Sequence, residues 1–421
     1  MEFSGSSTTV LALVEDVHDA VLENNSPTSS AESHSRLLSL IDQLRLAVET
    51  PTETVLRLIY QPPQNTAIRT LIDLGVFDLI VSRGEEGISA EELGKRTTAE
   101  RRLIVRLMRI ATALGFCTNP APEVYSANTK TPILTQPIGR DGVRCIYDLT
   151  MPTLSQLPSY FTEHTYTLPN DYTPSPMHWA TGQSQFEWLA DRRHQQAMFN
   201  SYMGSRRAGM KGWFDFYPVE RLTGSESSEY GHCTLDRGNS EERDKDEKGV
   251  FIVDVGGNQG HDLIRLREEC PDLRGKFILQ DLPTVVNAAV GDDGNRLRGM
   301  GIETMGYSFF NKQPVKGART YYLRSILHDW PDDKALTILR NTVAAMDPTH
   351  SRLIIVDFVL SDTEVPLMQS ALDIQMMCIG AGVERSRSEW AALLGTVGLE
   401  IRGVWSMGPG LESVIEAGLQ V

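Results

Sequence analysis

The 421-residue chain has five scattered cysteines, an excess of acidic residues and no long apolar run. None of the cysteines belongs to a C-x-x-C pair, which argues against both a disulfide framework and a zinc site. There are 40 basic and 55 acidic residues, a net charge of −15, so we expect neither nucleic acid nor an anionic membrane as a partner. No apolar stretch approaches ~18 residues, and the chain does not open with a basic segment followed by an apolar run. We therefore expect no membrane span and no signal peptide, and we expect a cytoplasmic location.

The most informative stretch is residues 249–283, GVFIVDVGGNQGHDLIRLREECPDLRGKFILQDLP. Residues 250–253 and 277–279 are short apolar runs typical of strands, and residues 261–270 have apolar positions at helical spacing. Parallel strands joined through a helix leave a crevice at their carboxyl ends, where nucleotide-like ligands bind. The stretch thus predicts one strand–helix–strand unit with a binding site beside its turn.

The turn itself, residues 254–260, does not match the loops that hold phosphates. It lacks both G-x-G-x-x-G and G-x-x-x-x-G-K-[ST]. The carboxylate of Asp254 suits a cation, while Gly256 and Gly257 let a ligand approach the backbone. Asp281 ends the second strand, where an acid accepts hydrogen bonds from ribose hydroxyls. We predict S-adenosylmethionine as the cofactor, the competing interpretation being a plain tight turn.

Around this unit the pattern predicts five segments. Residues 1–50 carry two apolar helical stripes, which pack either on the chain's own body or on a second copy. Residues 51–140 predict three helices and a hairpin, the order of a winged helix. Residues 141–221 are helical and rich in aromatic residues and methionine, so they either roof a flat apolar substrate or serve as core. Residues 222–249 predict a charged, disordered insertion, and residues 250–421 a doubly wound α/β sheet closed by an antiparallel pair.

A second informative stretch is YLRSILHDWP, residues 322–331, which follows a strand and precedes a helix. Its polar residues therefore lie at the carboxyl edge of the sheet. There His328 suits a general base near neutral pH, although it could instead cap the next helix. Asp357 ends the next strand, and Glu384 follows a loop able to fold back over the crevice. Two acids around one imidazole fit a base with orienting partners.

Five motifs give the chain, from about residue 55 onward, a resemblance to a known family: VDVGGNQGHDL, LQDLP, LRSILHDWPDD, IIVDFVL and GVERSRSEW. In this order they resemble the plant caffeate-type and fungal S-adenosylmethionine-dependent O-methyltransferases, a family that includes methyltransferase-like pericyclases. The resemblance implies a Rossmann-like methyltransferase domain behind an α-helical winged-helix dimerisation domain. It also implies a homodimer whose subunits complete each other's substrate pockets.

The resemblance gives His328 the place of the catalytic base, with Asp357 and Glu384 as its flanking acids. No metal is expected. The loop and the resemblance together predict these cofactor-binding residues: Asp254, Gly256, Gly257, Gly260, Asp281, Leu282, Ser308, Phe309 and Arg324. The predicted substrate-binding residues are His164 from the aromatic segment and, by resemblance, Met203, Asp373, Met376 and Met377.

The chain departs from the family pattern at four of these places. Ser308 stands where the family usually has an Asp near the adenine, and Arg324 where it usually has Lys. Asn258 replaces the third glycine of the loop, and Asn tolerates the left-handed conformation. Asp357 replaces the commoner Glu, which shortens the reach to His328.

These observations lead to one main hypothesis and two alternatives. The main hypothesis is an O-methyltransferase acting on a phenolic or enolic secondary metabolite of aromatic or polyketide type. The first alternative is an S-adenosylmethionine-binding pericyclase that catalyses a dehydration or a Diels–Alder-type cyclisation on the same fold. The second is a winged-helix regulator with a degenerate enzyme domain.

Overall fold

The computed structural model describes residues 7–206, 212–223, 249–406, 408 and 411–420. The charged insertion predicted at 222–249 lies, from residue 224 to 248, outside the described residues. The chain divides into two compact units. Unit 1 comprises Met1–Thr165 and Ala180–Met210, and unit 2 comprises Tyr166–Trp179 and Lys211–Val421.

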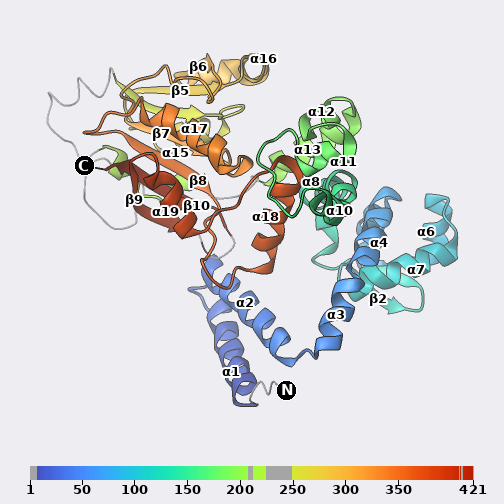
Figure 1. The fold of residues 1–421 in the computed structure, drawn as a ribbon. Helices are drawn as coiled ribbons and strands as arrows, with labels where there is room; N and C mark the ends of the chain where they lie inside the picture. The colour runs from blue at the N-terminus through green and yellow to red at the C-terminus, as the bar shows by residue number, and fades with distance from the viewer. Residues whose placement is uncertain (1–6, 207–211, 224–248, 407, 409–410, 421) are drawn as a thin grey trace. The chain divides into compact units, whose positions relative to one another are not determined.

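Unit 1 opens with a helical hairpin. Helices α1 (Ser7–Asn24) and α2 (Ala31–Val48) lie side by side (Figure 1), and α2 begins where the Ser30 hydroxyl accepts a hydrogen bond from Ser33 N at 3.1 Å. Helix α3 (Pro51–Ile59) follows and begins at a capping box on Thr50. All three helices expose large apolar side chains, which within the described residues of unit 1 have no covering layer.

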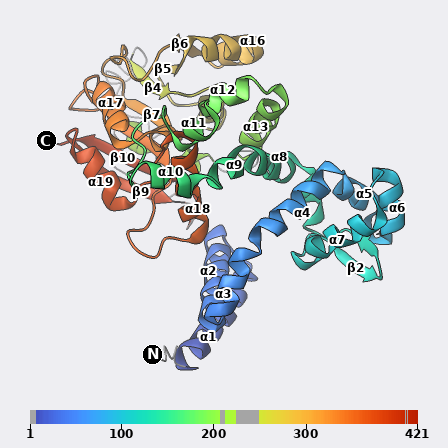
Figure 2. The ribbon, with the colours of Figure 1, turned by 45° about the vertical axis from the view of Figure 1, so that its right-hand side comes forward.

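The next part of unit 1 has the predicted order of three helices and a hairpin, with one extra helix. Gly75, at φ +67°, ends the first helix and lets the chain turn into the extra one, α5. Figure 2 shows α5, α6 and α7 gathered beside the small sheet, whose strand order is β1-β3-β2. The elements are α4 (Gln61–Asp73), α5 (Val76–Arg83), β1 (Ile88–Ser89), α6 (Ala90–Thr97), α7 (Arg101–Ala113), β2 (Thr118–Ala121) and β3 (Val124–Ser126).

The rest of unit 1 is helical, as predicted for this part of the chain. Helix α8 (Pro137–Cys145) packs against α13 (Arg193–Arg206). The ring of Tyr202 fills the space that a Cβ at Gly142 would need, and Ser201 donates to Asp141 at 2.7 Å. The other helices are α9 (Met151–Leu154), α10 (Leu157–Glu163), α11 (Pro176–Thr181) and α12 (Gln185–Ala190), of which α11 has residues in both units.

Unit 2 is built on a seven-stranded sheet of order β6-β5-β4-β7-β8-β10-β9. The first five strands in this order are parallel, while β10 runs antiparallel to both of its neighbours, which confirms the predicted closing pair. The chain leaves β4 toward β5 on one side and returns through β7 on the other, so the topological switch point lies between β4 and β7. The strands are β4 (Val250–Val255), β5 (Lys276–Asp281), β6 (Ile302–Gly306), β7 (Thr320–Arg324), β8 (Arg352–Asp357), β9 (Leu399–Ser406) and β10 (Ser413–Leu419).

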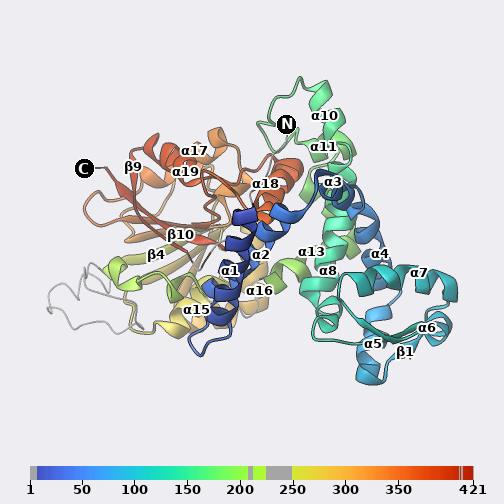
Figure 3. The same ribbon diagram turned by 90° about the horizontal axis from the view of Figure 1, so that it is seen from below.

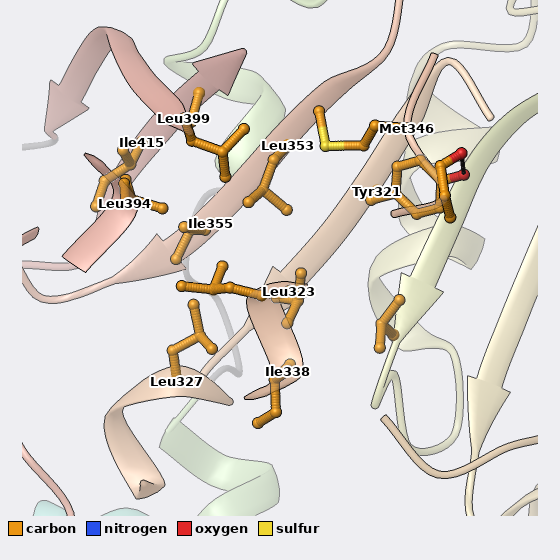
Figure 4. Packing of buried hydrophobic residues seen from close by; sticks show 14 of the residues in the cluster. Tyr321, Leu323, Leu327, Ile338, Met346, Leu353, Ile355, Leu394, Leu399 and Ile415 are labelled. Atoms are coloured by element: carbon orange, nitrogen blue, oxygen red, sulfur yellow. Dashed lines mark hydrogen bonds between the residues drawn. The ribbon is translucent and has the colours of Figure 1, made fainter. Parts of the chain in front are cut away.

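The sheet has a hydrophobic cluster on each face, because side chains alternate along every strand. On β8, Leu353 and Ile355 belong to one cluster, and Ile354 and Val356 to the other. Figure 4 shows the first cluster, and Figure 3 shows the helices that lie over the sheet. Helices α17 (Asp332–Val343) and α19 (Arg387–Gly395) contribute to the first cluster, and α15 (His261–Glu269) and α16 (Pro283–Gly299) to the second. Both faces are thus covered, so the edge at the carboxyl ends of the strands is left for a site.

Among the described residues, no helix is both long enough and apolar enough to cross a membrane.

Candidate active site

The glycine turn after β4 forms a tight backbone cradle at the switch point. Gly256 N and Gly257 N donate to the carbonyl of Gln280 at 2.8 and 3.1 Å. Gly256 has φ +80°, and a Cβ there would come within 2.5 Å of Ile326 Cδ1. A Cβ at Gly257 would lie 2.3 Å from Asp254 Oδ2. Neither position has room for a side chain, so the two glycines let the turn pack directly against Ile326 and Asp254.

Asp281, at the end of β5, holds the far side of this cradle. Its Oδ2 accepts from Asn258 N at 2.8 Å and its Oδ1 accepts from Leu282 N at 2.7 Å. The first bond fixes Asn258 at φ +53°, the left-handed conformation that Asn tolerates. Burial raises the pKa of Asp281 and outweighs these two hydrogen bonds, which lower it. The carboxylate keeps lone pairs for further donors, and Leu282 beside it is half exposed.

A buried pair of amides connects the cradle to the loop that follows β6. Gln280 and Gln313 exchange two side-chain hydrogen bonds of 2.9 Å, and they are 0 % and 1 % exposed. The loop they hold carries Ser308 and Phe309, and a Cβ at Gly256 would lie 3.7 Å from Phe309 Cε1. Phe309 therefore lies beside the glycine turn, with Ser308 preceding it.

Arg324 ends β7 in a buried ion-pair cluster. Its Nη1 donates to Asp262 at 2.8 Å and its Nη2 to Glu412 at 2.6 Å, and its side chain is 8 % exposed. The hydroxyl of Tyr322 also donates to Asp262, at 3.0 Å. The structure thus places Arg324 at the predicted edge, with its guanidinium already engaged by two carboxylates.

His328 lies at the same edge, in the short turn Leu327–Asp329 between β7 and α17, surrounded by acids. Its Nδ1 is 2.8 Å from Glu384 Oε1 and 3.7 Å from Asp357 Oδ1, while its Nε2 is 3.6 Å from Asp329 Oδ1. The side chains of Asp357 and Glu384 are each 1 % exposed, and that of Asp329 is 47 % exposed. Nδ1 therefore faces two buried acids, and Nε2 faces the side that solvent can reach.

Within the described part of the chain, neither carboxylate oxygen of Asp357 has a hydrogen bond, and neither does Glu384 Oε2. Burial alone lowers the pKa of His328, but the charges of Asp357 and Asp329 and the bond to Glu384 outweigh burial and raise the pKa from 6.5 to about 10. Burial raises the pKa of Asp357 from 3.8 to about 8, against the opposing pull of the imidazole. His328 and Asp357 therefore hold their protons more tightly than they do in water.

The predicted substrate residues are divided between the two units. Asp373, Met376 and Met377 lie on α18 (Leu367–Gly380) in unit 2, where Asp373 Oδ1 accepts from Glu384 N at 2.9 Å. His164 and Met203 lie in unit 1, and His164 Nδ1 bonds the carbonyl of Tyr160 at 2.8 Å. Helix α18 contacts the turn that carries His328, with Asp373 and Met376 beside the loop of Glu384, and the structure describes His164 and Met203 within unit 1 alone.

The structure also shows three groups of residues that the sequence reasoning missed. The first is the Gln280–Gln313 pair. The second is Tyr172, whose ring is 5.9 Å from that of Trp330 and occupies the space over Gly380. The third is Arg385, whose buried guanidinium contacts the turn that carries His328. The aromatic content of residues 141–221 marked the segment of Tyr172, and the motifs LQDLP and GVERSRSEW contain Gln280 and Arg385 without indicating their contacts. Among the described residues, no group of three or more His, Cys, Asp and Glu side chains is arranged to hold a metal ion.

Comparison with known proteins shows the family to which the chain belongs. Residues 247–400 match the model of an O-methyltransferase domain, and residues 63–136 that of an O-methyltransferase dimerisation domain. The methyltransferase cfoC of Aspergillus candidus is 30 % identical over 99 % of this chain and 98 % of its own length. The demethylsterigmatocystin 6-O-methyltransferase of Aspergillus parasiticus is 31 % identical, over 86 % of each chain.

Two solved structures are similar over almost the whole chain. One is described as a pericyclic reaction enzyme, with a TM-score of 0.80, 29 % identity and coverage of 99 % of this chain and 100 % of that one. The other is LepI in complex with S-adenosylmethionine, with a TM-score of 0.80, 29 % identity and coverage of 98 % and 100 %.

Proposed function

Since the chain belongs to the family of O-methyltransferases that carry a dimerisation domain, we propose that it transfers a methyl group from S-adenosylmethionine to a hydroxyl oxygen of a small phenolic or enolic metabolite. The observation that carries the proposal is the 2.8 Å contact between His328 Nδ1 and Glu384 Oε1, which orients one imidazole at the switch-point edge of the sheet. His328 is then the base, and Nε2 is the atom that receives the substrate proton. The relative from Aspergillus parasiticus, named for O-methylation of demethylsterigmatocystin, supports a substrate of this class.

The cradle after β4 fits the cofactor. Gly256 and Gly257 have no side chains to come between a ligand and the backbone of the turn, and Asp281 offers lone pairs to ribose hydroxyls. Leu282 and Phe309 supply the apolar sides of an adenine pocket, and Ser308 supplies a hydroxyl where the family usually has a charge. When bound, S-adenosylmethionine supplies an electrophilic methyl group on a sulfonium. LepI, which binds this ligand, has a similar fold over almost its whole length.

The electrostatics around His328 suit the removal of a phenolic proton. A phenol has a pKa near ~10, so it is a poor nucleophile at neutral pH until it loses this proton. The surrounding acids raise the pKa of His328 to about 10, so the ring acts as a base only through its minor neutral form, and the proton then passes between two groups of similar pKa. Glu384 holds Nδ1, so the proton is accepted at Nε2, and the adjoining Glu384 carboxylate stabilises the imidazolium that results. The partly exposed Asp329, 3.6 Å from Nε2, gives the proton a route to water.

A second candidate function is a pericyclic reaction in which the cofactor is retained. Two observations favour it: the match to a solved pericyclic reaction enzyme, and a cluster that holds His328 as an imidazolium at neutral pH. An imidazolium donates a hydrogen bond, and such a donor stabilises developing negative charge on a carbonyl oxygen. In this function His328 acts as a hydrogen-bond donor and no proton is removed from a hydroxyl.

The two candidates are separated by supplying methyl-labelled S-adenosylmethionine with a panel of phenols, pyridones and polyketide enols, and analysing products by mass spectrometry. Label in the product, with an equal amount of S-adenosylhomocysteine, supports the transferase. A product of unchanged or dehydrated mass, without S-adenosylhomocysteine, supports the pericyclase and refutes methyl transfer.

We further propose that the chain acts as a homodimer. The dimerisation-domain match covers residues 63–136, and the preceding helices expose apolar side chains such as Leu11, Leu22 and Leu58, at 64, 61 and 67 %. Patches of this kind mark interaction surfaces. Light scattering should give twice the chain mass of 46.8 kDa, and a stable monomer at micromolar concentration would contradict the proposal.

A further inference from the structure

Two separate loops of unit 2 carry His328 and Glu384, and among the described residues one backbone hydrogen bond joins these loops. The turn after β7 carries His328, and the loop after α18 carries Glu384. Val383 N donates to the His328 carbonyl at 2.8 Å. A Cβ at Gly382 would lie 2.5 Å from that same carbonyl oxygen, so only glycine allows the loops to approach this closely. One backbone hydrogen bond is a weak constraint on the geometry of an imidazole and a carboxylate.

The guanidinium of Arg385 supplies the rest of the connection. Its side chain is 1 % exposed and lies under the turn that carries His328. Nη1 donates to the carbonyl of Leu327 at 3.0 Å, and Nη2 donates to that of Trp330 at 2.8 Å. These two carbonyls come from either side of His328, so the guanidinium spans the turn. Nε and Nη2 also donate to Asp332 Oδ1, at 3.0 and 2.8 Å, at the first turn of α17.

Arg385 follows Glu384 directly in the chain, so its hydrogen bonds to the turn of His328 also restrain the position of Glu384. The residue that grips the turn of His328 is covalently attached to the acid that orients its Nδ1. A planar guanidinium with several donors in fixed directions can bind two carbonyls and a carboxylate at once, and a lysine ammonium lacks that fork. The ring of Trp390 lies 5.3 Å from the guanidinium carbon and closes the site from below.

We propose that Arg385 is a positioning residue that sets the distance and angle between His328 and Glu384. It touches neither substrate nor cofactor in this role, and acts through His328. The predicted change in turnover rests on the proposed function. The placement of His328 against Glu384 can be measured in the resting protein, without turnover. A misplacement of about 1 Å in a catalytic group can lower the rate ~10²-fold, so a modest loosening of the turn is detectable.

The test is Arg385→Lys in the full chain, with Arg267→Lys as the matched control. Arg267 also donates to two backbone carbonyls, of Leu273 at 2.7 Å and Gly275 at 3.0 Å, and it also lies over an aromatic ring, that of Phe277. It belongs to unit 2 but has no contact with the turn of His328 among those the structure describes. Both variants lose the same kind of structural contact, so a purely structural role predicts the same behaviour for both.

The primary readout is the pKa and tautomer of His328, measured by NMR on protein labelled in histidine with ¹⁵N and ¹³C. The signal is assigned by its loss in His328→Gln. In Arg385→Lys we expect the pKa of His328 to fall by ~1–2 units, because the carboxylates that raise it are no longer held against the ring. In Arg267→Lys we expect no change.

The second readout is kcat, expected to fall ~10²-fold in Arg385→Lys with KM for S-adenosylmethionine within about twofold of the wild type.

If Arg385→Lys does not fold, Asp332→Asn replaces it. This variant removes the carboxylate that orients the guanidinium, and the Asp332 side chain is 70 % exposed at a helix start where Asn is tolerated. The same shift in the pKa of His328, at smaller size, is expected. An unchanged His328 signal in a folded variant overturns the inference. A His328 signal that moves while His328→Ala retains turnover leaves Arg385 in its positioning role and refutes His328 as the base.

Discussion

Two carboxylates on neighbouring strands of unit 2 are equally buried and differ in their surroundings. Glu416 on β10 and Asp357 on β8 are each 1 % exposed. Glu416 accepts from Tyr217 Oη at 3.1 Å and from Arg221 Nε at 2.8 Å, and it lies 3.4 Å from Arg352 Nε. Asp357 has no hydrogen bond among the described residues, and its nearest cation is His328 Nδ1 at 3.7 Å.

The difference separates an acid that its neighbours satisfy from one to which the proposed function gives a chemical role. A buried carboxylate without donors is unfavourable, and natural proteins retain few such groups. Glu416 is neutralised and connects the segment around Tyr217 to the sheet, so it contributes to stability. Asp357 gains no comparable stabilisation from its neighbours. Its effect is instead to raise the pKa of His328. Buried groups of this second kind gather at functional sites.

The largest effect should follow from removing the histidine. We expect His328→Ala to lower turnover by ~10²–10⁴-fold, because general base catalysis contributes about that much. Its affinity for S-adenosylhomocysteine, measured by calorimetry, should stay within about twofold of the wild type, since the cradle after β4 is separate. Loss of affinity with turnover retained would show that His328 supports the cofactor site, and the contrast between the two acids would lose its functional meaning.

The next effect should be on stability and should come from the satisfied acid. Glu416→Ala leaves the buried Tyr217 hydroxyl without its acceptor, which costs about 1–3 kcal/mol, and it frees Arg221 and Arg352, which are partly exposed. Urea unfolding followed by circular dichroism measures this loss. Turnover per folded molecule should be unchanged. A variant with unaltered stability would mean that Glu416 does not stabilise the fold by connecting the segment around Tyr217 to the sheet.

The smallest effect on stability should come from the unsatisfied acid. We expect Asp357→Asn to change the unfolding free energy by less than about 1 kcal/mol near pH 4, because no hydrogen bond is lost and the carboxyl group of the folded wild type is uncharged there. The pKa of Asp357 is raised by burial from 3.8 to about 8, so its carboxyl group in the folded state keeps a proton that it loses in the unfolded state. The stability this provides is present below pH ~4 and is lost as the pH rises through ~8.

Asp357→Asn does not titrate, so its stability relative to the wild type should improve between pH ~4 and ~8. The raised pKa of His328 acts in the same direction in the wild type, since its contribution is lost as the pH rises from 6.5 through about 10. Urea unfolding at several pH values tests the trend. A variant that loses stability relative to the wild type on going to higher pH would contradict the assignment of Asp357 as a desolvated acid.

The sequence was sufficient for much of the fold because the evidence for it is local. The apolar runs, the glycine turn and the helical spacing of residues 249–283 predicted β4, α15 and β5, and the predicted closing strands pair as expected. The place of His328 and Asp357 followed from a simple rule, that parallel strands end at one edge. The alternation of polar and apolar residues says nothing about Gln280 with Gln313, or about Arg385 with two carbonyls, because these contacts join residues that only the folded chain brings together.

Gln280 has a consequence for protein engineering. Its backbone carbonyl receives both N–H groups of the glycine turn, and its amide side chain holds the loop of Ser308 and Phe309 through Gln313. Two sides of the proposed cofactor pocket therefore depend on one residue, and a substitution there disturbs both together. Libraries aimed at accepting donors with larger alkyl groups or altered bases should keep Gln280 and Gln313 fixed and vary Ser308 and Phe309, where a change reshapes one side of the pocket alone.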